Sequence, residues 1–271
     1  MSETSVPLII EPADLEKQLA SDTIFVIDLC KPEIYVRAHI PGAVHLDYAQ
    51  IVATRPPVMG LIPEAAQLSA LFSGIGLNPG HHVVAYDDEG GGRAARLLWT
   101  LEVIGHKRFS LLNGGIQAWS AEHRPLTQEI RPRAKSDYPV RGAATAFVTK
   151  DYIKDHLGKA GIVLLDARTP EEYRGEKRLA ARAGHIPGAV NFDWVNAIDQ
   201  KNSLRLKPAA ELRRVLTALG VTEDKEVIAY CQTHHRSAHT FIVLKSLGFT
   251  RIAGYPGSWS EWGNSPDTPV E

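Results

Sequence analysis

Short runs of apolar residues alternate along the chain with longer segments in which apolar and polar residues follow the spacing of an α-helix. The apolar runs have the length of a buried β-strand and lie at residues 25–27, 83–86, 163–165 and 227–230. The helical pattern is carried by residues 93–104 and 237–247. Because such alternation is typical of a parallel sheet with helices on both faces, the pattern predicts an α/β fold.

This pattern occurs twice. Residues 39–44 and 185–190 share the sequence HIPGAV, and each follows an apolar run that ends in an aspartate, Asp28 or Asp166. The second copy is longer within residues 176–184. We therefore predict two similar domains, each a central parallel sheet flanked by helices on both faces. Their expected bounds are residues 1–124 and 146–271, joined by a proline-containing surface linker at 125–145.

Composition and charge narrow the class of protein. The 271 residues carry 30 Lys+Arg and 31 Asp+Glu, a net charge of −1, and 44% of them are hydrophobic. Such a globular chain lacks the basic excess typical of proteins that bind nucleic acid or anionic membranes, so we expect neither partner. No apolar stretch has the length of a transmembrane helix, and the first residues lack the pattern of a secretory signal. We expect a cytoplasmic monomer that acts on small molecules.

The two cysteines, Cys30 and Cys231, can form neither a disulfide framework nor a cysteine-rich zinc site. Cys231 follows an apolar run and precedes a helical segment, so it is expected at the edge of the sheet where ligands bind in open α/β folds. A tight loop that enters a helix directs backbone N–H groups inward, which binds an anion and lowers the pKa of a cysteine. Cys30 lies beside a core run and is expected to pack there.

The loop from Cys231 ends at Arg236, whose guanidinium suits an oxyanion. Its loss is therefore expected to weaken donor binding more than folding. The first copy has Asp87 where the second has Cys231. We interpret the second copy as active and the first as silent. His39 in the first copy and His185 in the second occupy the same position of the repeat. Because the silent copy also has this histidine, we expect both to bind backbone carbonyls rather than to act in catalysis.

The repeated HIPGAV segment, the cysteine loop in the second copy alone, and the closing YPGSWSEW at 255–262 resemble the tandem-domain rhodaneses. The loop CQTHHR is similar to that of a bacterial thiosulfate sulfurtransferase subgroup. The resemblance implies that sulfane sulfur moves from thiosulfate to cyanide or a dithiol through a persulfide on Cys231. It implies ping-pong kinetics and no metal or organic cofactor.

We also expect substrate contacts around the cysteine. They are Gln232, Thr233, His234, His235 and Arg236, with Arg174 and Arg178 as further cations. The family's arginine before an aromatic residue would fall at Glu172, so Arg174 or Arg178 is considered in its place. Trp259 and Trp262 either line the pocket or hold the C-terminal segment.

Other activities remain open at the level of the sequence. The loop matches neither the CRK of many thiosulfate-specific members nor the CGSG of mercaptopyruvate-specific ones, which leaves 3-mercaptopyruvate as an alternative donor. Thiolate phosphatases also use a cysteine loop that ends in arginine and serine, but theirs is one residue longer. A non-catalytic sulfur-binding module would require an inert Cys231.

Overall fold

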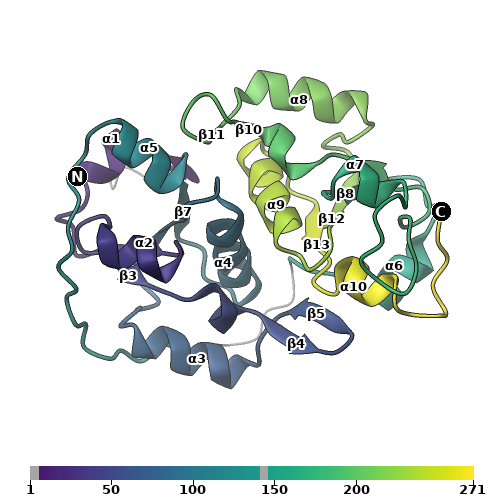
Figure 1. The fold of residues 1–271 in the computed structure, drawn as a ribbon. Helices are drawn as coiled ribbons and strands as arrows, with labels where there is room; N and C mark the ends of the chain where they lie inside the picture. Colours follow the sequence, from purple (N-terminus) through teal and green to yellow (C-terminus); the bar gives the residue numbers. More distant parts are fainter. Residues whose placement is uncertain (1–5, 141–145) are drawn as a thin grey trace. The chain divides into compact units, whose positions relative to one another are not determined.

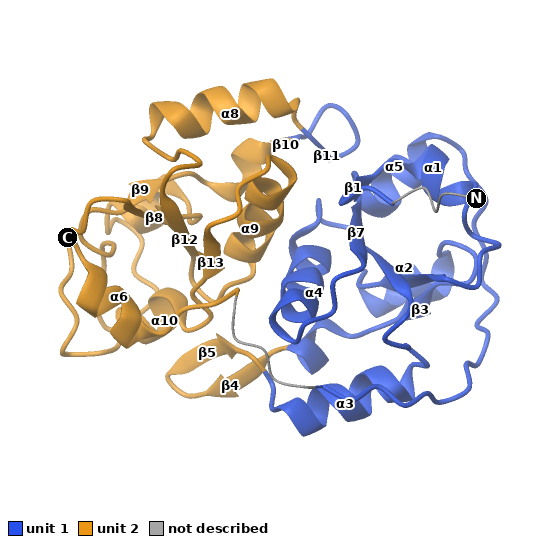
Figure 2. Ribbon diagram, turned by 180° about the vertical axis from the view of Figure 1, so that it is seen from behind, with its two compact units in different colours: residues 1–51, 63–143, 199–206 blue, residues 52–62, 144–198, 207–271 orange. Residues whose placement is uncertain are grey.

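The computed structural model describes residues 6–140 and 146–271, which fold into two compact units (Figures 1 and 2). Unit 1 holds the described residues within 1–51, 63–143 and 199–206, and unit 2 holds those within 52–62, 144–198 and 207–271. The predicted continuous ranges therefore differ from the units at 52–62 and 199–206. Residues 52–62 belong to unit 2, where they pack against the helix Ser258–Trp262, and hydrophobic periodicity does not encode contacts between such distant residues.

Unit 1 is built on a five-stranded sheet in the order β1-β7-β6-β2-β3, and all four pairings are parallel. The strands are β1 (Ile9–Ile10), β2 (Ile24–Asp28), β3 (Val44–His45), β6 (His82–Tyr86) and β7 (Phe109–Leu112). The helices are α1 (Pro12–Glu16), α2 (Pro32–Arg37), η1 (Tyr48–Ile51), α3 (Ala65–Gly74), α4 (Gly92–Val103) and α5 (Gly115–Ala121). Every residue of β2 and β6 is buried, as expected for a parallel sheet covered on both faces.

Unit 2 repeats this arrangement with a parallel sheet in the order β13-β12-β8-β9. The strands are β8 (Ile162–Asp166), β9 (Val190–Asn191), β12 (Glu226–Tyr230) and β13 (Ile252–Gly254). The helices are α6 (Lys150–His156), α7 (Pro170–Tyr173), η2 (Trp194–Ala197), α8 (Ala209–Ala218), α9 (Arg236–Ser246) and α10 (Ser258–Trp262). A parallel bridge between Phe147 and Gly254 extends the sheet beyond β13, as β1 does beside β7 in unit 1. The predicted α/β fold of both copies is confirmed.

The histidine of each HIPGAV turn forms a hydrogen bond with a backbone carbonyl. His39 Nδ1 lies 2.8 Å from the carbonyl oxygen of Tyr35, and His185 Nδ1 lies 2.8 Å from that of Tyr173. Each imidazole also stacks on the same tyrosine, with ring centroids 4.0 and 3.7 Å apart. The structural role predicted for both histidines is confirmed.

The tryptophan near the end of each copy fastens the segment that follows it. Trp119 Nε1 donates to the carbonyl of Pro125 at 2.8 Å, and Trp262 Nε1 donates to that of Pro269 at 2.7 Å. Of the two roles considered for Trp262, the structure supports the second, in which it holds the C-terminal segment.

The described residues also form two short hairpins. β4 (Ala53–Arg55) and β5 (Val58–Leu61) pair antiparallel and belong to unit 2, where β5 packs against α10. β10 (Ile198–Asp199) and β11 (Arg205–Leu206) form the second. Across the described part of the chain, helices that combine enough length and apolar character to span a lipid bilayer are absent.

Candidate active site

Cys231 lies directly after β12 and before the loop that leads into α9, and it is 1% exposed. Its backbone N–H and carbonyl are both held by the first two residues of α10. The Cys231 N–H donates to Ser258 Oγ at 3.3 Å, and its carbonyl accepts the Trp259 N–H at 2.9 Å. The cysteine is therefore fixed at the carboxyl end of the sheet, where the sequence predicts it.

The loop after Cys231 is tightly wound. His234 is buried and has a φ of 54°, in the left-handed region that a non-glycine residue adopts at a cost. Its Nδ1 lies 2.7 Å from Ser237 Oγ, and this hydrogen bond holds the ring in place. His235 lies at the N-cap of α9, with its ring 5.9 Å from that of Trp194. Strained backbone at a fixed polar loop is typical of functional sites.

Several groups act on the Cys231 thiol in opposite directions. Burial raises its pKa, whereas the charge of Arg236 and hydrogen bonds from Ser237 and from the Thr233 N–H lower it. The net result is a pKa below the usual value of a cysteine. The direction agrees with the prediction from the loop sequence, and it makes the nucleophilic thiolate available closer to neutral pH.

Arg236 is paired with a buried carboxylate. Its Nη1 donates to Glu172 Oε2 at 2.6 Å and its Nη2 to Glu172 Oε1 at 2.8 Å. Glu172 lies on α7 and is 1% exposed. Burial raises the pKa of this carboxyl, but the hydrogen bonds and charge of Arg236 outweigh burial and hold it below its usual range. The positive charge of Arg236 thus acts on the thiolate and on Glu172 together.

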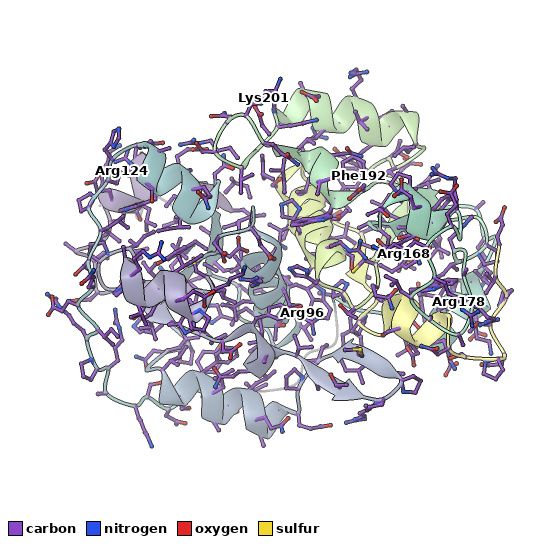
Figure 3. All side chains as sticks on the ribbon, viewed as in Figure 1. Arg96, Arg124, Arg168, Arg178, Phe192 and Lys201 are labelled. Carbon is purple, nitrogen blue, oxygen red and sulfur yellow. The ribbon has the colours of Figure 1, made fainter. Side chains whose placement is uncertain are left out.

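A second buried ion pair joins Arg168 to Asp166, and the charge of Arg168 acts on Glu172 of the first pair. Figure 3 labels Arg168. Arg168, 1% exposed, donates through Nε and Nη2 to both carboxylate oxygens of Asp166 at 2.6–3.0 Å. Its guanidinium also lies 4.5 Å from the ring centroid of Trp259, the residue that binds the Cys231 carbonyl. Trp259 therefore connects this pair to the cysteine instead of only lining a pocket.

The hairpin β4–β5 supports the cysteine loop within unit 2. Met59 exchanges two hydrogen bonds of 3.0 Å with Ser260 Oγ on α10. Gly60, with a φ of 82°, lies so close to Thr233 that a Cβ built on it would be 2.0 Å from the Thr233 carbonyl oxygen. Only glycine fits this approach, so the hairpin fixes the loop's backbone.

The corresponding loop of unit 1 holds a carboxyl group of its own, whose pKa is raised by burial. Asp87 is fully buried, and its Oδ1 accepts the N–H groups of Glu89 at 3.0 Å and Gly91 at 2.8 Å. Its Oδ2 accepts the N–H of Ala94 at 2.9 Å. These donors come from the loop and the start of α4, as Thr233 and Ser237 come from the loop and the start of α9 in unit 2. The carboxylate thus fills the space that surrounds the thiol in the second copy.

The remaining predicted residues make contacts of other kinds. Gln232 Nε2 donates to the Leu179 carbonyl at 3.1 Å, which joins the cysteine loop to the lengthened segment 176–184. Arg174 pairs with Glu176 at 2.7 Å, and Arg178 donates to backbone carbonyls of its own segment. Both arginines are thus paired within their own segment, and a contact of either one with a substrate stays a prediction.

Sequence reasoning missed three contributors to the site. The sequence marks Glu172 only as a position that lacks the family's arginine, although the Thr169–Glu172 capping-box pattern fixes its side chain at the start of α7. Ser237 was visible as the residue after Arg236, but its bond to the thiol was not. Gly60 carries no local signal, because its role depends on contact with distant Thr233.

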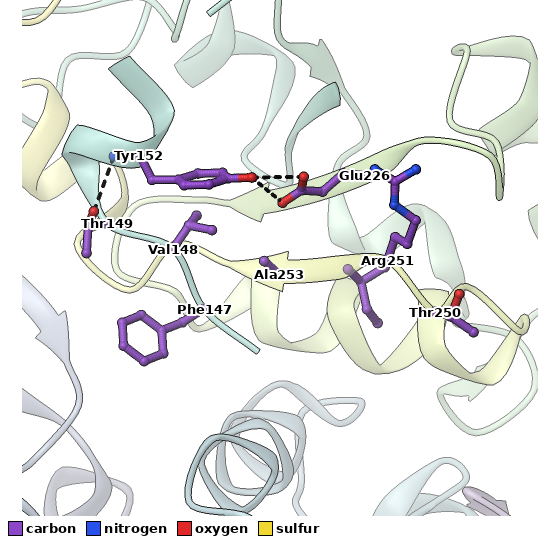
Figure 4. A pocket seen from close by; sticks show the side chains of 9 residues that line it. Phe147, Val148, Thr149, Tyr152, Glu226, Thr250, Arg251 and Ala253 are labelled. Carbon is purple, nitrogen blue, oxygen red and sulfur yellow. Dashed lines mark hydrogen bonds between the residues drawn. The ribbon is translucent and has the colours of Figure 1, made fainter. Parts of the chain in front are cut away.

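A separate cavity of about 580 Å³ lies at the opposite end of the sheet in unit 2 (Figure 4). It includes residues at the start of β12 and β13, where Tyr152 donates to both carboxylate oxygens of Glu226 at 2.9–3.0 Å. Cys231 follows the other end of β12. This cavity is therefore separate from the site around Cys231.

A family model described as a rhodanese-like domain matches the chain twice, at residues 11–122 and 149–265. The chain belongs to the rhodanese family. The tandem arrangement deduced from the internal repeat is confirmed by this pair of matches.

Curated rhodanese relatives match nearly the whole chain. Thiosulfate sulfurtransferase of Azotobacter vinelandii is 47% identical over 267 residues, and the match covers 98% of both chains. Thiosulfate sulfurtransferase of Pseudomonas aeruginosa is 46% identical, with 99% and 98% covered. Sulfur carrier protein TtuD of Thermus thermophilus is 37% identical, with 88% of this chain and 86% of that protein covered.

Solved structures share the fold at lower identity. The wild-type structure of EanB superposes with a TM-score of 0.87 at 21% identity, covering 97% of this chain and 69% of that one. The crystal structure of YnjE gives a TM-score of 0.86 at 21% identity, covering 97% and 68%. Both show that the fold of this chain occurs in solved structures.

Proposed function

We propose that this rhodanese is a thiosulfate sulfurtransferase that carries sulfane sulfur as a persulfide on Cys231. The observation that carries the proposal is the buried Cys231 thiol, whose pKa is lowered by Arg236, Ser237 and Thr233. The names of two curated relatives with 46–47% identity over nearly the full length support thiosulfate as the donor.

The first half-reaction follows from this geometry. The Cys231 thiolate attacks the outer sulfur of thiosulfate, a new S–S bond forms, and the bond to the sulfite sulfur breaks with its electron pair. Sulfite leaves as a dianion, and the persulfide retains the single negative charge of the thiolate. Backbone N–H groups of the loop and the guanidinium of Arg236 face this charge and stabilise it.

The second half-reaction returns the enzyme to the thiolate. A thiophilic acceptor, cyanide or a dithiol, attacks the outer sulfur of the persulfide and leaves with it. Every step uses the thiolate and the loop alone, so we propose ping-pong turnover with no metal or organic cofactor.

The remaining site residues fit supporting roles in this scheme. Thr233 and His235 lie within the loop, Gln232 ties it to residue 179, and His234 holds Ser237 in place. We propose that Arg174 and Arg178 attract anionic donors from the rim.

We further propose that the protein acts as a monomer in the cytoplasm. Each unit buries its own hydrophobic core, so neither needs a second chain to complete it. Both Cys30 and Cys231 are free thiols, as is usual in a reducing compartment.

The test is a steady-state assay of thiocyanate formation from thiosulfate and cyanide. Cys231→Ala should lose activity, whereas Cys30→Ala, at a buried thiol whose pKa is raised by burial, should keep it. Transfer by Cys231→Ala at the wild-type rate would overturn the proposal. A higher kcat/KM for 3-mercaptopyruvate than for thiosulfate would replace the donor but keep the cysteine chemistry.

A further inference from the structure

The charges beside Cys231 cancel in pairs. Arg236 is matched by Glu172, and the neighbouring Arg168 is matched by Asp166. Both terminal nitrogens of Arg236 already donate to the carboxylate. A donor with two negative charges therefore meets a site whose permanent cations are neutralised, and whose nucleophile is itself an anion.

The carboxylate of Glu172 is fastened in place by more than Arg236. Its Oε2 accepts the Thr169 N–H at 3.2 Å, and its own N–H donates to Thr169 Oγ1 at 3.4 Å. The side chain of Glu172 is 2% exposed, and that of Arg236 is 18% exposed. The buried Glu172 thus holds the guanidinium in place, while the side chain of Arg236 keeps some access to solvent.

We infer that Glu172 is a positioning residue that orients Arg236 and limits the affinity of the site for dianionic donors. The inference rests on the proposed function. A buried negative charge repels a donor in proportion to the donor's own charge, so it disfavours thiosulfate more than a singly charged sulfane donor. Glu172 would therefore set the balance between donors at this site.

Glu172→Gln tests this inference because it keeps the shape of the side chain and removes its charge. We expect the KM for thiosulfate to fall about tenfold, and the KM for benzenethiosulfonate, a monoanion with the same sulfane sulfur, about threefold, since the electrostatic energy scales with charge. The midpoint of Cys231 alkylation by iodoacetamide should shift to lower pH, because Arg236 then acts on the thiolate alone.

Two further variants separate charge from geometry. Glu171→Gln removes the adjacent exposed carboxylate, and we expect it to change neither KM by more than about twofold. Glu172→Asp keeps the charge but shortens the side chain, so the KM for thiosulfate should not fall. These variants leave in place the ionisable groups whose charges act on the pair, among them Asp166, Arg168, Asp193 and Cys231.

The outcomes decide the inference in either direction. Equal changes of KM for the two donors, an unmoved alkylation midpoint in Glu172→Gln, or a lower KM in Glu172→Asp would each overturn it. Should Glu172→Gln not fold, the result for Glu172→Asp still decides. Alkylation requires no sulfur transfer, so a shifted midpoint with no activity toward either donor in the wild type would count against the proposed function instead.

Discussion

Replacing Arg236 by alanine should destabilise the protein as well as slow it. The substitution removes both hydrogen bonds from Glu172 and leaves a carboxylate with a 2% exposed side chain without its counter-ion. Removal of one partner from a buried ion pair costs about 3–5 kcal/mol. The 18% exposure of Arg236 admits water to the site, which places the expected loss near the lower end, about 3 kcal/mol.

This magnitude can be read from urea unfolding at pH 7. With a denaturant dependence of about 1–3 kcal/mol per molar, the midpoint of the affected transition should fall by about 1–3 M. The double variant Arg236→Ala/Glu172→Gln should recover at least half of the loss, because no unpaired charge then remains buried. The sequence alone predicted an effect on donor binding more than on folding, and the partner Glu172 changes that expectation.

The same pair predicts a pH dependence. Because the pKa of Glu172 is lower in the folded protein than in the unfolded chain, its stabilisation is fully present above the unfolded value of about 4.3. It is lost as the pH falls through the lower, folded value. In Arg236→Ala the pKa of this carboxyl should rise, so the stability gap to the wild type should narrow between about pH 7 and pH 4. A gap below about 1 kcal/mol at pH 7, or no recovery in the double variant, would refute this reasoning.

Three further substitutions, the first with a matched control, test other parts of the account. Gly60→Ala should lose most transfer activity in the thiosulfate assay. The control Gly42→Ala, at a φ of 78° with open space where its Cβ would lie, should keep its activity and lose only about 1–2 kcal/mol of unfolding free energy. Equal losses of activity in the two variants would contradict a specific role for the hairpin. Ser237→Ala should move the midpoint of Cys231 alkylation to higher pH, because a hydrogen bond to the thiolate is lost, and an unchanged midpoint would remove this serine from the site. Asp87→Ala should lower the unfolding free energy by about 1–3 kcal/mol, because it leaves buried N–H donors unpaired, yet keep kcat; a loss of turnover in the folded variant would contradict a silent first unit.

The sequence predicted most of the fold because each copy of the repeat could be compared with the other. The strand and helix patterns recur in both copies, and the identical turn at 39–44 and 185–190 fixed their alignment. The observed strands β6 and β12 begin one residue before the predicted runs, at His82 and Glu226. Helices α4 and α9 each begin and end one residue before the predicted bounds.

The parts that the sequence did not predict depend on contacts between distant residues. The pairing of Glu172 with Arg236 joins positions on α7 and α9, and the approach of Gly60 to Thr233 joins a hairpin to a loop. Neither has a periodic or local signal. Periodicity likewise gave continuous domains, because it does not show that residues 52–62 pack with the second copy.

The central claim is that Cys231 carries the transferred sulfur, and intact mass tests it most directly. The protein is measured as purified, after thiosulfate, and after subsequent cyanide, with peptide mapping of the loaded form. We predict a gain of one sulfur atom, about 32 Da, on the peptide with Cys231, and its loss on addition of cyanide. A protein that gains no mass from thiosulfate, or that carries the added sulfur on Cys30, would contradict the account.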